Sequence, residues 1–253
     1  MKRIVIKIGT NAMTRQDLTI DERLLKALVA ECAKVRKTAD VLIVSSGAMG
    51  CGHTLMKLGR HDEVTRRQMY AVVGQVKLMG LYAEFFGKHG LNVAQMLTTK
   101  NDFTNRAHYL NTKNCLESLF KEKIVPVMNE NDFVAVEELM FTDNDELAGM
   151  ATKMVGADKM IMLTNVDGVF DTKGKVISEF GSKDRMPKHL LTADKSSFGK
   201  GGIQNKFKVS KAVAESGTEV VIANSRAKNV ITRILKGEKV GTKFKAKKGK
   251  KSA

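Results

Sequence analysis

The sequence has no tryptophan and little proline or cysteine: its 253 residues include 2 prolines and 3 cysteines. So few prolines exclude collagen-like proteins and proline-rich linkers. The cysteines, Cys32, Cys51 and Cys115, are odd in number, far apart and in no CxxC pair, so neither a disulfide framework nor a zinc site is indicated. Unpaired cysteines are typical of a reducing compartment, and we therefore expect a cytoplasmic protein.

Long apolar runs are also missing. No segment approaches the ~18 to 20 apolar residues of a membrane helix. The chain begins MKRIVIKIG, which has the basic head of a signal peptide, but Lys7 interrupts the apolar stretch and no small-residue cleavage site follows. We therefore expect no membrane partner.

Acidic residues are scarce relative to basic ones. The chain has 43 Lys and Arg against 27 Asp and Glu, a formal charge of +16, and is 43% hydrophobic. That apolar content excludes a disordered basic protein, whereas the charge indicates an anionic partner: nucleic acid, membrane surface, nucleotide or acidic metabolite. Six of the lysines lie in residues 243–253, a run without acids that is typical of a solvated tail.

Short runs rich in Val and Ile alternate with helical patterns along the whole chain. Each run has the length and composition of a strand buried on both faces. This alternation predicts an α/β fold, an open and mainly parallel sheet sandwiched between helices. Strands are expected over Arg3–Ile8, Val41–Ser45, Asn92–Leu97, Ile124–Met128, Lys159–Leu163 and Glu219–Ala223. Helices are expected over Asp21–Lys37, Asp62–Lys88, Thr104–Glu122, Asn144–Val155 and Ile203–Ser216.

Two segments depart from this alternation. Phe133–Phe141 has the pattern of a hairpin, and Val169–Ser197 is rich in Gly, Lys and Asp. The sequence shows no internal repeat and no linker rich in Gly, Ser or Pro.

The ends of the expected strands carry polar residues, and ligands of open α/β sheets bind beyond the carboxyl ends of the strands. The first strand runs into Lys7-Ile8-Gly9-Thr10, where glycine permits close backbone approach to an anion and lysine adds a cation. Lys7 is unusual, because a charge inside a buried strand needs a counter-ion. An ordinary turn is the alternative. The second strand ends in VSSGAMG over residues 44–50, which is either an anion-binding nest or a tight turn.

The fourth strand ends in Asn-Glu-Asn-Asp over residues 129–132, an arrangement suited to binding an ammonium group. Shortly afterwards Thr-Asp-Asn-Asp over residues 142–145 opens a helix, where Thr142 or Asp143 can equally be an N-cap. A glycine-rich loop, residues 199–202, then precedes a helix and has the composition of a phosphate site, although flexible surface loops share it. There is no GxGxxG and no GxxxxGK[ST], so neither dinucleotide binding nor a Walker loop is supported.

With these motifs in this order, the sequence resembles the amino acid kinase family. The matching segments are VIKIGT (5–10), VSSGAMG (44–50), GQVKLMGLY (74–82), QMLTT (95–99), IVPVMNENDFVAV (124–136), TDNDELA (142–148), LTNVDGVF (163–170), GKGGIQNK (199–206) and VGTKF (240–244). The NEND segment and the DND helix start are most typical of the members that phosphorylate glutamate. The chain departs from the family where Lys200 and Asn205 replace threonine and Asn165 replaces aspartate, and it ends in lysines where many relatives carry an RNA-binding-type PUA module.

The resemblance implies a kinase domain over residues 1–244 and a basic, disordered tail over 245–253. It implies ATP-dependent phosphorylation of the γ-carboxylate of L-glutamate to γ-glutamyl phosphate, the first step of proline synthesis, with ATP and Mg²⁺. Lys7 and Lys206 would flank the transferred phosphoryl group, and Asp145 would hold both lysines. Ser46 and Asn144 would donate to carboxylate oxygens, and Asp132 would bind the α-ammonium group. The implied ATP-binding residues are Lys7, Gly9, Thr164, Asn165, Lys200, Gly201, Gly202, Ile203, Gln204, Asn205 and Lys206.

The family resemblance also implies a homo-oligomer, a dimer or tetramer, and a functional link to a glutamyl phosphate reductase. One alternative is another kinase of the family, acting on acetylglutamate, aspartate or uridylate. Acetylglutamate has no free ammonium group for Asp132 to bind. The alternative from another class is a nucleic-acid-binding or regulatory protein on this scaffold, which the charge and the tail would suit. We expect nucleic acid not to be the primary partner, because the chain lacks a basic surface interleaved with aromatics.

Overall fold

The computed structural model describes residues 2–134, 144–181, 183–191 and 202–247. Eight strands form one sheet in the order β3-β4-β2-β1-β5-β7-β8-β6. Every pair is parallel except β7 with β8, so the predicted mainly parallel sheet is confirmed. The strands are β1 Lys2–Ile8, β2 Ala39–Ser45, β3 Val93–Thr98, β4 Val125–Glu130, β5 Lys159–Thr164, β6 Glu179–Phe180, β7 Glu219–Asn224 and β8 Thr242–Phe244.

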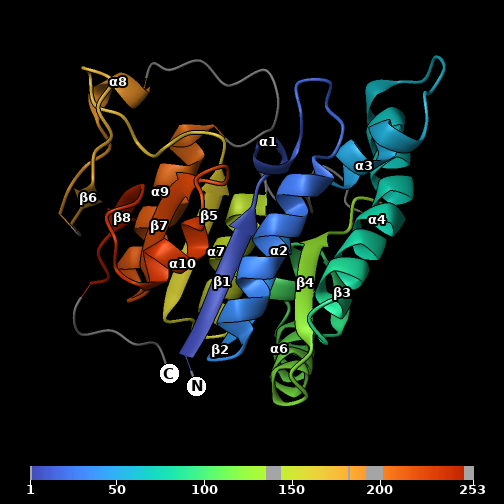
Figure 1. Ribbon diagram of the computed structural model, residues 1–253, viewed down its shortest axis with the longest axis horizontal. Helices are drawn as coiled ribbons and strands as arrows, with labels where there is room; N and C mark the ends of the chain where they lie inside the picture. Colours follow the sequence, from blue (N-terminus) through green and yellow to red (C-terminus); the bar gives the residue numbers. More distant parts are fainter. Residues whose placement is uncertain (1, 135–143, 182, 192–201, 248–253) are drawn as a thin grey trace.

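Helices cover both faces of this sheet (Figure 1). Polar side chains start three of the longer helices: Asp21, Asp62 and Asn105 each accept a hydrogen bond from a backbone N–H of the first turn. The helices are α1 Thr10–Met13, α2 Glu22–Arg36, α3 Ala48–Leu55, α4 Glu63–Gly87, α5 Asn101–Thr104, α6 Arg106–Lys121, α7 Asn144–Met154, α8 Lys188–Leu191, α9 Ile203–Glu215 and α10 Val230–Leu235.

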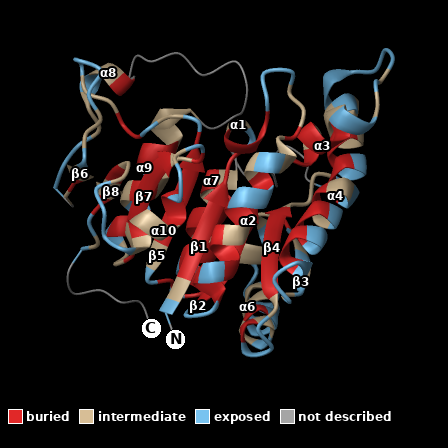
Figure 2. Cartoon of the chain, in the orientation of Figure 1, coloured by how far each residue is buried: buried red, intermediate tan, exposed pale blue. Residues whose placement is uncertain are grey.

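Alternate residues of the central strands face opposite layers of the core. On β1, Ile4, Ile6 and Ile8 join one apolar cluster, which also contains residues of α2, α4 and α10. Val5 joins the other cluster, with residues of α6, α7 and α9. The fold is therefore a three-layer sandwich, and the central strands are almost wholly buried (Figure 2). By this alternation Lys7 lies on the face covered by α7 and α9.

The predicted strands and helices lie within about two residues of the observed ones. The expectation that all six strands are buried on both faces is wrong for β3. This strand is at the edge of the sheet, and Leu97 in it is 41% exposed. The short strands β6 and β8 were not expected. The predicted hairpin over Phe133–Phe141 lies outside the described residues from 135 onward, and residues 132–134 form a turn.

Helices α3 and α4 pack unusually closely. A Cβ atom on Gly74 of α4 would lie 1.8 Å from the carbonyl oxygen of Ala48, at the start of α3. Gly47, the residue before α3, has a φ of 98°, and a side chain there would meet the sulfur of Met13. Glycine at both positions therefore fixes α4 against the turn that follows β2.

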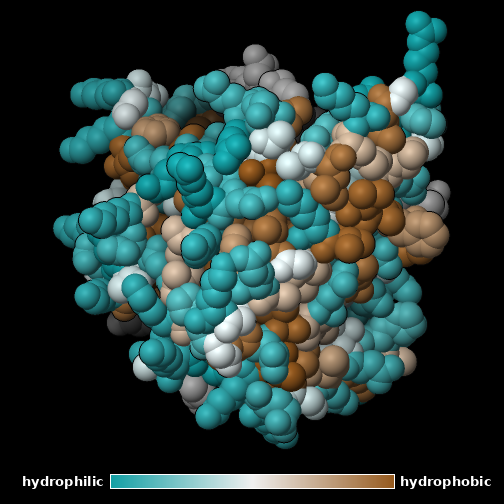
Figure 3. Space-filling model, turned by 45° about the vertical axis from the view of Figure 1, so that its right-hand side comes forward, coloured by the Kyte–Doolittle hydropathy of each residue, from teal (hydrophilic) through white to brown (hydrophobic). Residues whose placement is uncertain are grey.

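The β3 end of the molecule carries an exposed apolar face, which Figure 3 shows as a hydrophobic area. Val76 of α4 is 77% exposed and Phe133 is 71% exposed. Among the described residues, the other exposed large apolar side chains are Leu55, Val64, Val72, Val73, Leu97, Leu110 and Val134. Among the helices that the structure describes, none combines the length and apolar character of a membrane span.

At the other end of the sheet, the first residues of the predicted tail contact the body of the protein. The backbone N–H of Lys245 donates to Phe180, and that of Lys247 donates to Ala214 in α9.

Candidate functional site

The strand ends that the sequence singles out lie at one edge of the sheet. Ile8 at the end of β1 is in register with Ser45 of β2 and with Leu163 of β5. The backbone N–H of Gly9 donates to Leu163 over 3.3 Å, and that of Ser46 donates to Ile8 over 2.9 Å. The turns after these three central strands are therefore held together. After β4 the chain crosses β1 to reach β5, so this edge is also a point where the strand order reverses.

Two lysines and one aspartate form a buried cluster beside these turns, which we call the charged triad: Lys7, Asp145 and Lys206. The Lys7 Nζ contacts one carboxylate oxygen of Asp145, and the Lys206 Nζ lies 2.7 Å from the other. Asp145 is fully buried, and the exposed fractions of Lys7 and Lys206 are 3% and 9%. The three residues come from β1, α7 and α9, 199 positions apart in the sequence at most.

The electrostatics of the triad favour an anion. Burial alone would raise the pKa of Asp145, but the nearby ammonium groups of Lys7 and Lys206 outweigh it and hold this pKa below 3.8. Two ammonium groups against one carboxylate leave one positive charge in a site largely removed from water. Such a charge is costly to bury without a counter-ion, so an anionic ligand at this position is stabilised.

Asn144 precedes Asp145 in the first turn of α7 and belongs to a second cluster, made of polar side chains. Its Nδ2 donates to the Ser46 Oγ over 3.0 Å and to the Asn129 Oδ1 over 2.8 Å. It also lies 3.3 Å from the carbonyl oxygen of Ser45. The Asn129 Nδ2 in turn donates to the Gln75 Oε1 over 3.0 Å. We call Gln75, Asn129, Asn144 and Ser46 the amide chain.

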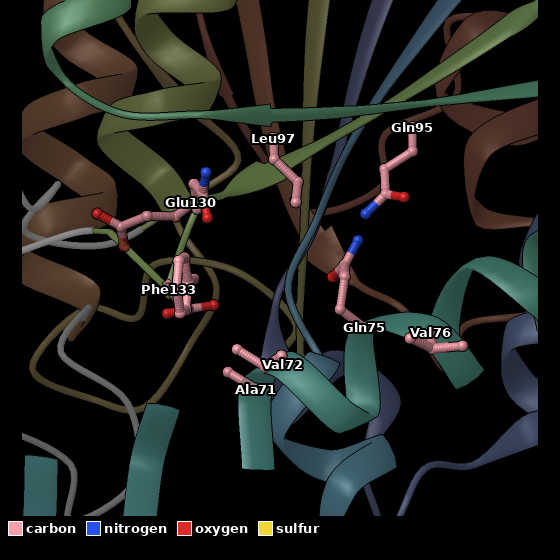
Figure 4. Close-up of a pocket in the computed structure, with 10 residues that line it drawn as sticks. Ala71, Val72, Gln75, Val76, Gln95, Leu97, Glu130 and Phe133 are labelled. Atoms are coloured by element: carbon pink, nitrogen blue, oxygen red, sulfur yellow. The ribbon is translucent and has the colours of Figure 1, made fainter. Parts of the chain in front are cut away.

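A cavity of about 210 Å³ is lined by residues of α4, of β3 and of the end of β4 with the turn after it (Figure 4). Asp132 lines it, together with Glu130 and Gln75. In Figure 4 the side chains of Gln75 and Gln95 point toward one another across this space. The remaining lining residues are Ala71, Val72, Val76, Leu97, Asn131 and Phe133. The cavity therefore combines carboxylates and amides with the exposed apolar face.

The residues expected on the nucleotide side lie around the ends of β1 and β5 and the start of α9. Thr164 is buried at the end of β5, and its hydroxyl lies 3.4 Å from the side-chain oxygen of the exposed Asn165. Gly202 precedes α9 and provides no side-chain cap, and the positive end of a helix dipole at such a position favours an anion. Lys200 and Gly201 lie outside the described residues. Ile203, Gln204 and Asn205 form the first turn of α9.

The structure thus brings Lys7, Asp145 and Lys206 into contact, and Ser46 with Asn144. Sequence reasoning did not select Gln75 or Asn129 as site residues. A signal was present for Asn129, which belongs to the Asn-Glu-Asn-Asp motif at the end of β4. Gln75 is one polar residue on a long helix and has no such signal. Their partners, however, are 54 and 15 positions apart, and only the fold joins them.

Comparisons with known proteins find relatives over almost the whole chain. The profile described as "Amino acid kinase family" matches residues 2–224. A glutamate 5-kinase of Chlorobaculum tepidum is 41% identical over 99% of this chain and 71% of its own length. A glutamate 5-kinase of Bacteroides thetaiotaomicron is 40% identical over 92% of this chain and 66% of its own length. A glutamate 5-kinase of Alkaliphilus metalliredigens is 35% identical over 97% of this chain and 96% of its own length.

Proposed function

Since the chain belongs to the amino acid kinase family, we propose that it transfers the γ-phosphoryl group of ATP to the γ-carboxylate of L-glutamate. The products are ADP and γ-glutamyl phosphate, an intermediate of proline synthesis. The buried charged triad of Lys7, Asp145 and Lys206 is the observation that carries this proposal. Similarity to glutamate 5-kinases over nearly the whole chain supports the choice of glutamate.

The reaction needs charge neutralisation more than proton transfer. A carboxylate with a pKa of about 4.3 is already ionised at neutral pH, so no general base is required. One of its oxygens forms the new bond to phosphorus, while the bond from phosphorus to the oxygen bridging to ADP breaks and ADP leaves with that electron pair. The repulsion between the anionic carboxylate and the polyphosphate is the main obstacle, and fixed cations reduce it.

In this mechanism Lys7 and Lys206 flank the transferred phosphoryl group from β1 and α9. Asp145 is a positioning residue, because each of its oxygens is engaged by one lysine and so both ammonium groups are held at a fixed separation. Lysine has a long, mobile side chain. Tethering both lysines to one carboxylate before ATP binds lowers the cost of ordering them in the transition state.

The amino acid would bind between the amide chain and the cavity beside it. We assign Ser46 to a carboxylate of the substrate, Asp132 to its α-ammonium group, and Asn144, which contacts Ser46, to the same amino acid site. Gly9 follows β1, and Thr164 and Asn165 lie at the end of β5, on the opposite side of β1 from β2. With residues 200–206 they would contact the nucleotide. The glycine-rich start of α9 suits the phosphates.

The described residues offer no group of three or more His, Cys, Asp and Glu side chains that could enclose a metal ion. Both oxygens of Asp145 are engaged by lysines. A dedicated protein cage for Mg²⁺ therefore does not fit this part of the chain. The ion would enter with ATP, held by phosphate oxygens and water as is usual for magnesium, where it shields the phosphate charge.

The decisive test is ATP-dependent formation of γ-glutamyl hydroxamate when the protein is incubated with L-glutamate and hydroxylamine, which traps the acyl phosphate. Aspartate and acetylglutamate are tested in the same assay, and uridylate is tested by ATP-dependent formation of ADP, because its diphosphate product does not form a hydroxamate. We expect product with glutamate and at least tenfold less with the others. A preference for one of the other acceptors, or no ATP turnover with any of them, would contradict the proposal.

A kinase domain over residues 1–244, a dimer or tetramer, a reductase partner and a cytosolic location stay predictions. Light scattering of the purified protein measures the oligomeric state. Binding of RNA at several salt concentrations, with the full chain and with a chain ending at Phe244, tests the tail as a polyanion site.

A further inference from the structure

Two side-chain atoms of the amide chain, the Gln75 Nε2 and the Asn144 Oδ1, are buried without a hydrogen-bond partner in the described part of the protein, and the second lies beside the charged triad. A buried acceptor without a donor is costly. Its presence beside the charged triad indicates that a ligand supplies the missing donor.

The backbone N–H of Glu130 fixes the orientation of the side-chain amides in the amide chain. The backbone N–H of Glu130 donates over 2.9 Å to the side chain of Asn129, and only an oxygen can accept it. The Asn129 Oδ1 therefore faces Glu130 and Asn144, and its Nδ2 faces Gln75. Asn144 must then present its Nδ2 to Asn129, because two side-chain oxygens would repel each other.

The consequence for the substrate differs from the role that the sequence suggested for Asn144. The Nδ2 of this residue is engaged by Asn129 and Ser46, so the group left for the substrate is an acceptor. Glutamate at neutral pH has two carboxylates, which accept hydrogen bonds, and one α-ammonium group, which donates them. The ammonium group is thus the complement of the Asn144 Oδ1. The Ser46 hydroxyl accepts from Asn144 and keeps its own proton for a carboxylate.

Gln75 is at one end of the amide chain, on the part of α4 that packs closely against α3. It is 8% exposed, and it follows Gly74, where α4 contacts the start of α3 so closely that no side chain fits. Helix α3 begins directly after Ser46 and Gly47. The two ends of the amide chain, Gln75 and Ser46, are therefore also joined through the α3–α4 contact, which fixes the distance that the amides bridge.

We propose that Gln75 is a positioning residue for amino acid recognition: through Asn129 it holds the Asn144 oxygen toward the substrate α-ammonium group. This inference rests on the proposed function, because it takes glutamate as the substrate. Loss of the Gln75 acceptor leaves the Nδ2 of Asn129, a residue 3% exposed, without its partner. Asn129 then rotates to find another acceptor, and Asn144 loses its orientation.

The test compares Gln75→Met, which has a similar length but no acceptor of that strength, with Gln75→Glu, which keeps an oxygen for the Asn129 amide. Gln68→Met is the matched control, since Gln68 lies two turns earlier on α4 and its Nε2 is 3.5 Å from the carbonyl oxygen of Phe133. The readouts are KM for glutamate, KM for ATP, kcat, and the inhibition constant of glutarate, which is glutamate without its α-ammonium group.

We expect Gln75→Met to raise KM for glutamate at least tenfold, while KM for ATP, kcat and the inhibition constant of glutarate change less than threefold. Gln68→Met should stay within threefold of the unmodified protein, and Gln75→Glu, which restores an acceptor for Asn129, should have a lower KM for glutamate than Gln75→Met. If the inhibition constant of glutarate rises in parallel with KM, or if Gln75→Met leaves KM unchanged, the proposal is wrong. Gln75→Ala replaces Gln75→Met if the latter is insoluble, because it also removes the acceptor. Failure of the unmodified protein to form any γ-glutamyl hydroxamate would instead reject the proposed function itself.

Discussion

Replacing Asp145 with asparagine removes the one negative charge of the charged triad while keeping its shape. At the 2.7 Å that separates the Lys206 Nζ from Asp145, opposite charges attract by roughly 6 kcal/mol at an effective dielectric constant of about 20. The cost of burying these ions offsets part of that attraction. Breaking a buried pair by removing one partner typically costs about 3–5 kcal/mol, and here two ammonium groups lose their partner. We therefore expect Asp145→Asn to lower the free energy of unfolding at pH 7 by about 3–5 kcal/mol.

The pH dependence of this loss follows from the pKa of Asp145. The folded protein holds this pKa below its ordinary value of 3.8, so the unfolded chain binds a proton at a higher pH than the folded protein does. The stabilisation from Asp145 is fully present above the unfolded pKa and is lost as the pH falls through the folded pKa. The difference between the two proteins should stay constant from pH 7 to about 5 and shrink below 3.8.

Urea unfolding monitored by circular dichroism at several pH values measures this difference. Asp62→Asn is the control, since Asp62 is exposed and asparagine caps a helix as well as aspartate does. In the hydroxamate assay Asp145→Asn should lower kcat by at least ~10²-fold, the scale for losing fixed charge in an active site. A stability loss under 1 kcal/mol at pH 7, or one independent of pH, would refute the assignment of Asp145 as the buried counter-ion of both lysines.

Three further changes test the site and its support. Lys206→Ala should lower kcat by ~10²-fold or more with the fold retained, because one fixed cation is lost from the transition state, and near-normal turnover would contradict its role. Asp132→Ala should raise KM for glutamate far more than KM for ATP, and equal effects on both would reject it as an amino acid ligand. Gly74→Ala should destabilise the protein by about 1–3 kcal/mol, because its Cβ would meet the carbonyl oxygen of Ala48, as thermal unfolding can show. The matched change Gly80→Ala on the same helix meets no atom within 4 Å and should stabilise by about 0.5–1 kcal/mol, so equal shifts of Tm would refute the packing argument.

Most of the fold was predictable because its signals are local. The six longer strands and five longer helices can be predicted from their residue composition and hydrophobic period. Every residue of the central strand β2 is buried, as expected for a strand covered on both faces. The edge position of β3 was not predictable, because strand order depends on contacts between distant segments. Strands β6 and β8, of two and three residues, are too short to carry a period and exist only by pairing with neighbours.

The candidate site divides in the same way. Lys7 was recognisable because a charge in an apolar strand requires a partner, and the structure supplies Asp145 at that place. Gln75 was not recognisable, since one glutamine on a long helix has no distinctive pattern of its own. Its role depends on the hydrogen bond from Asn129, a residue of β4. A charged residue inside an apolar run can be recognised in the sequence, whereas the neutral amide chain can be recognised only in the three-dimensional structure.

Asn144 and Asp145 share one peptide bond at the start of α7, yet their side chains belong to the amide chain and the charged triad respectively. Successive residues of a helix project about 100° apart, so one turn of backbone presents both groups in different directions. Amino acid selection and phosphoryl transfer are therefore mechanically linked at a single point. An inhibitor large enough to push Asn144 aside would also shift the carboxylate that aligns the two lysines, and so would slow turnover as well as exclude the substrate.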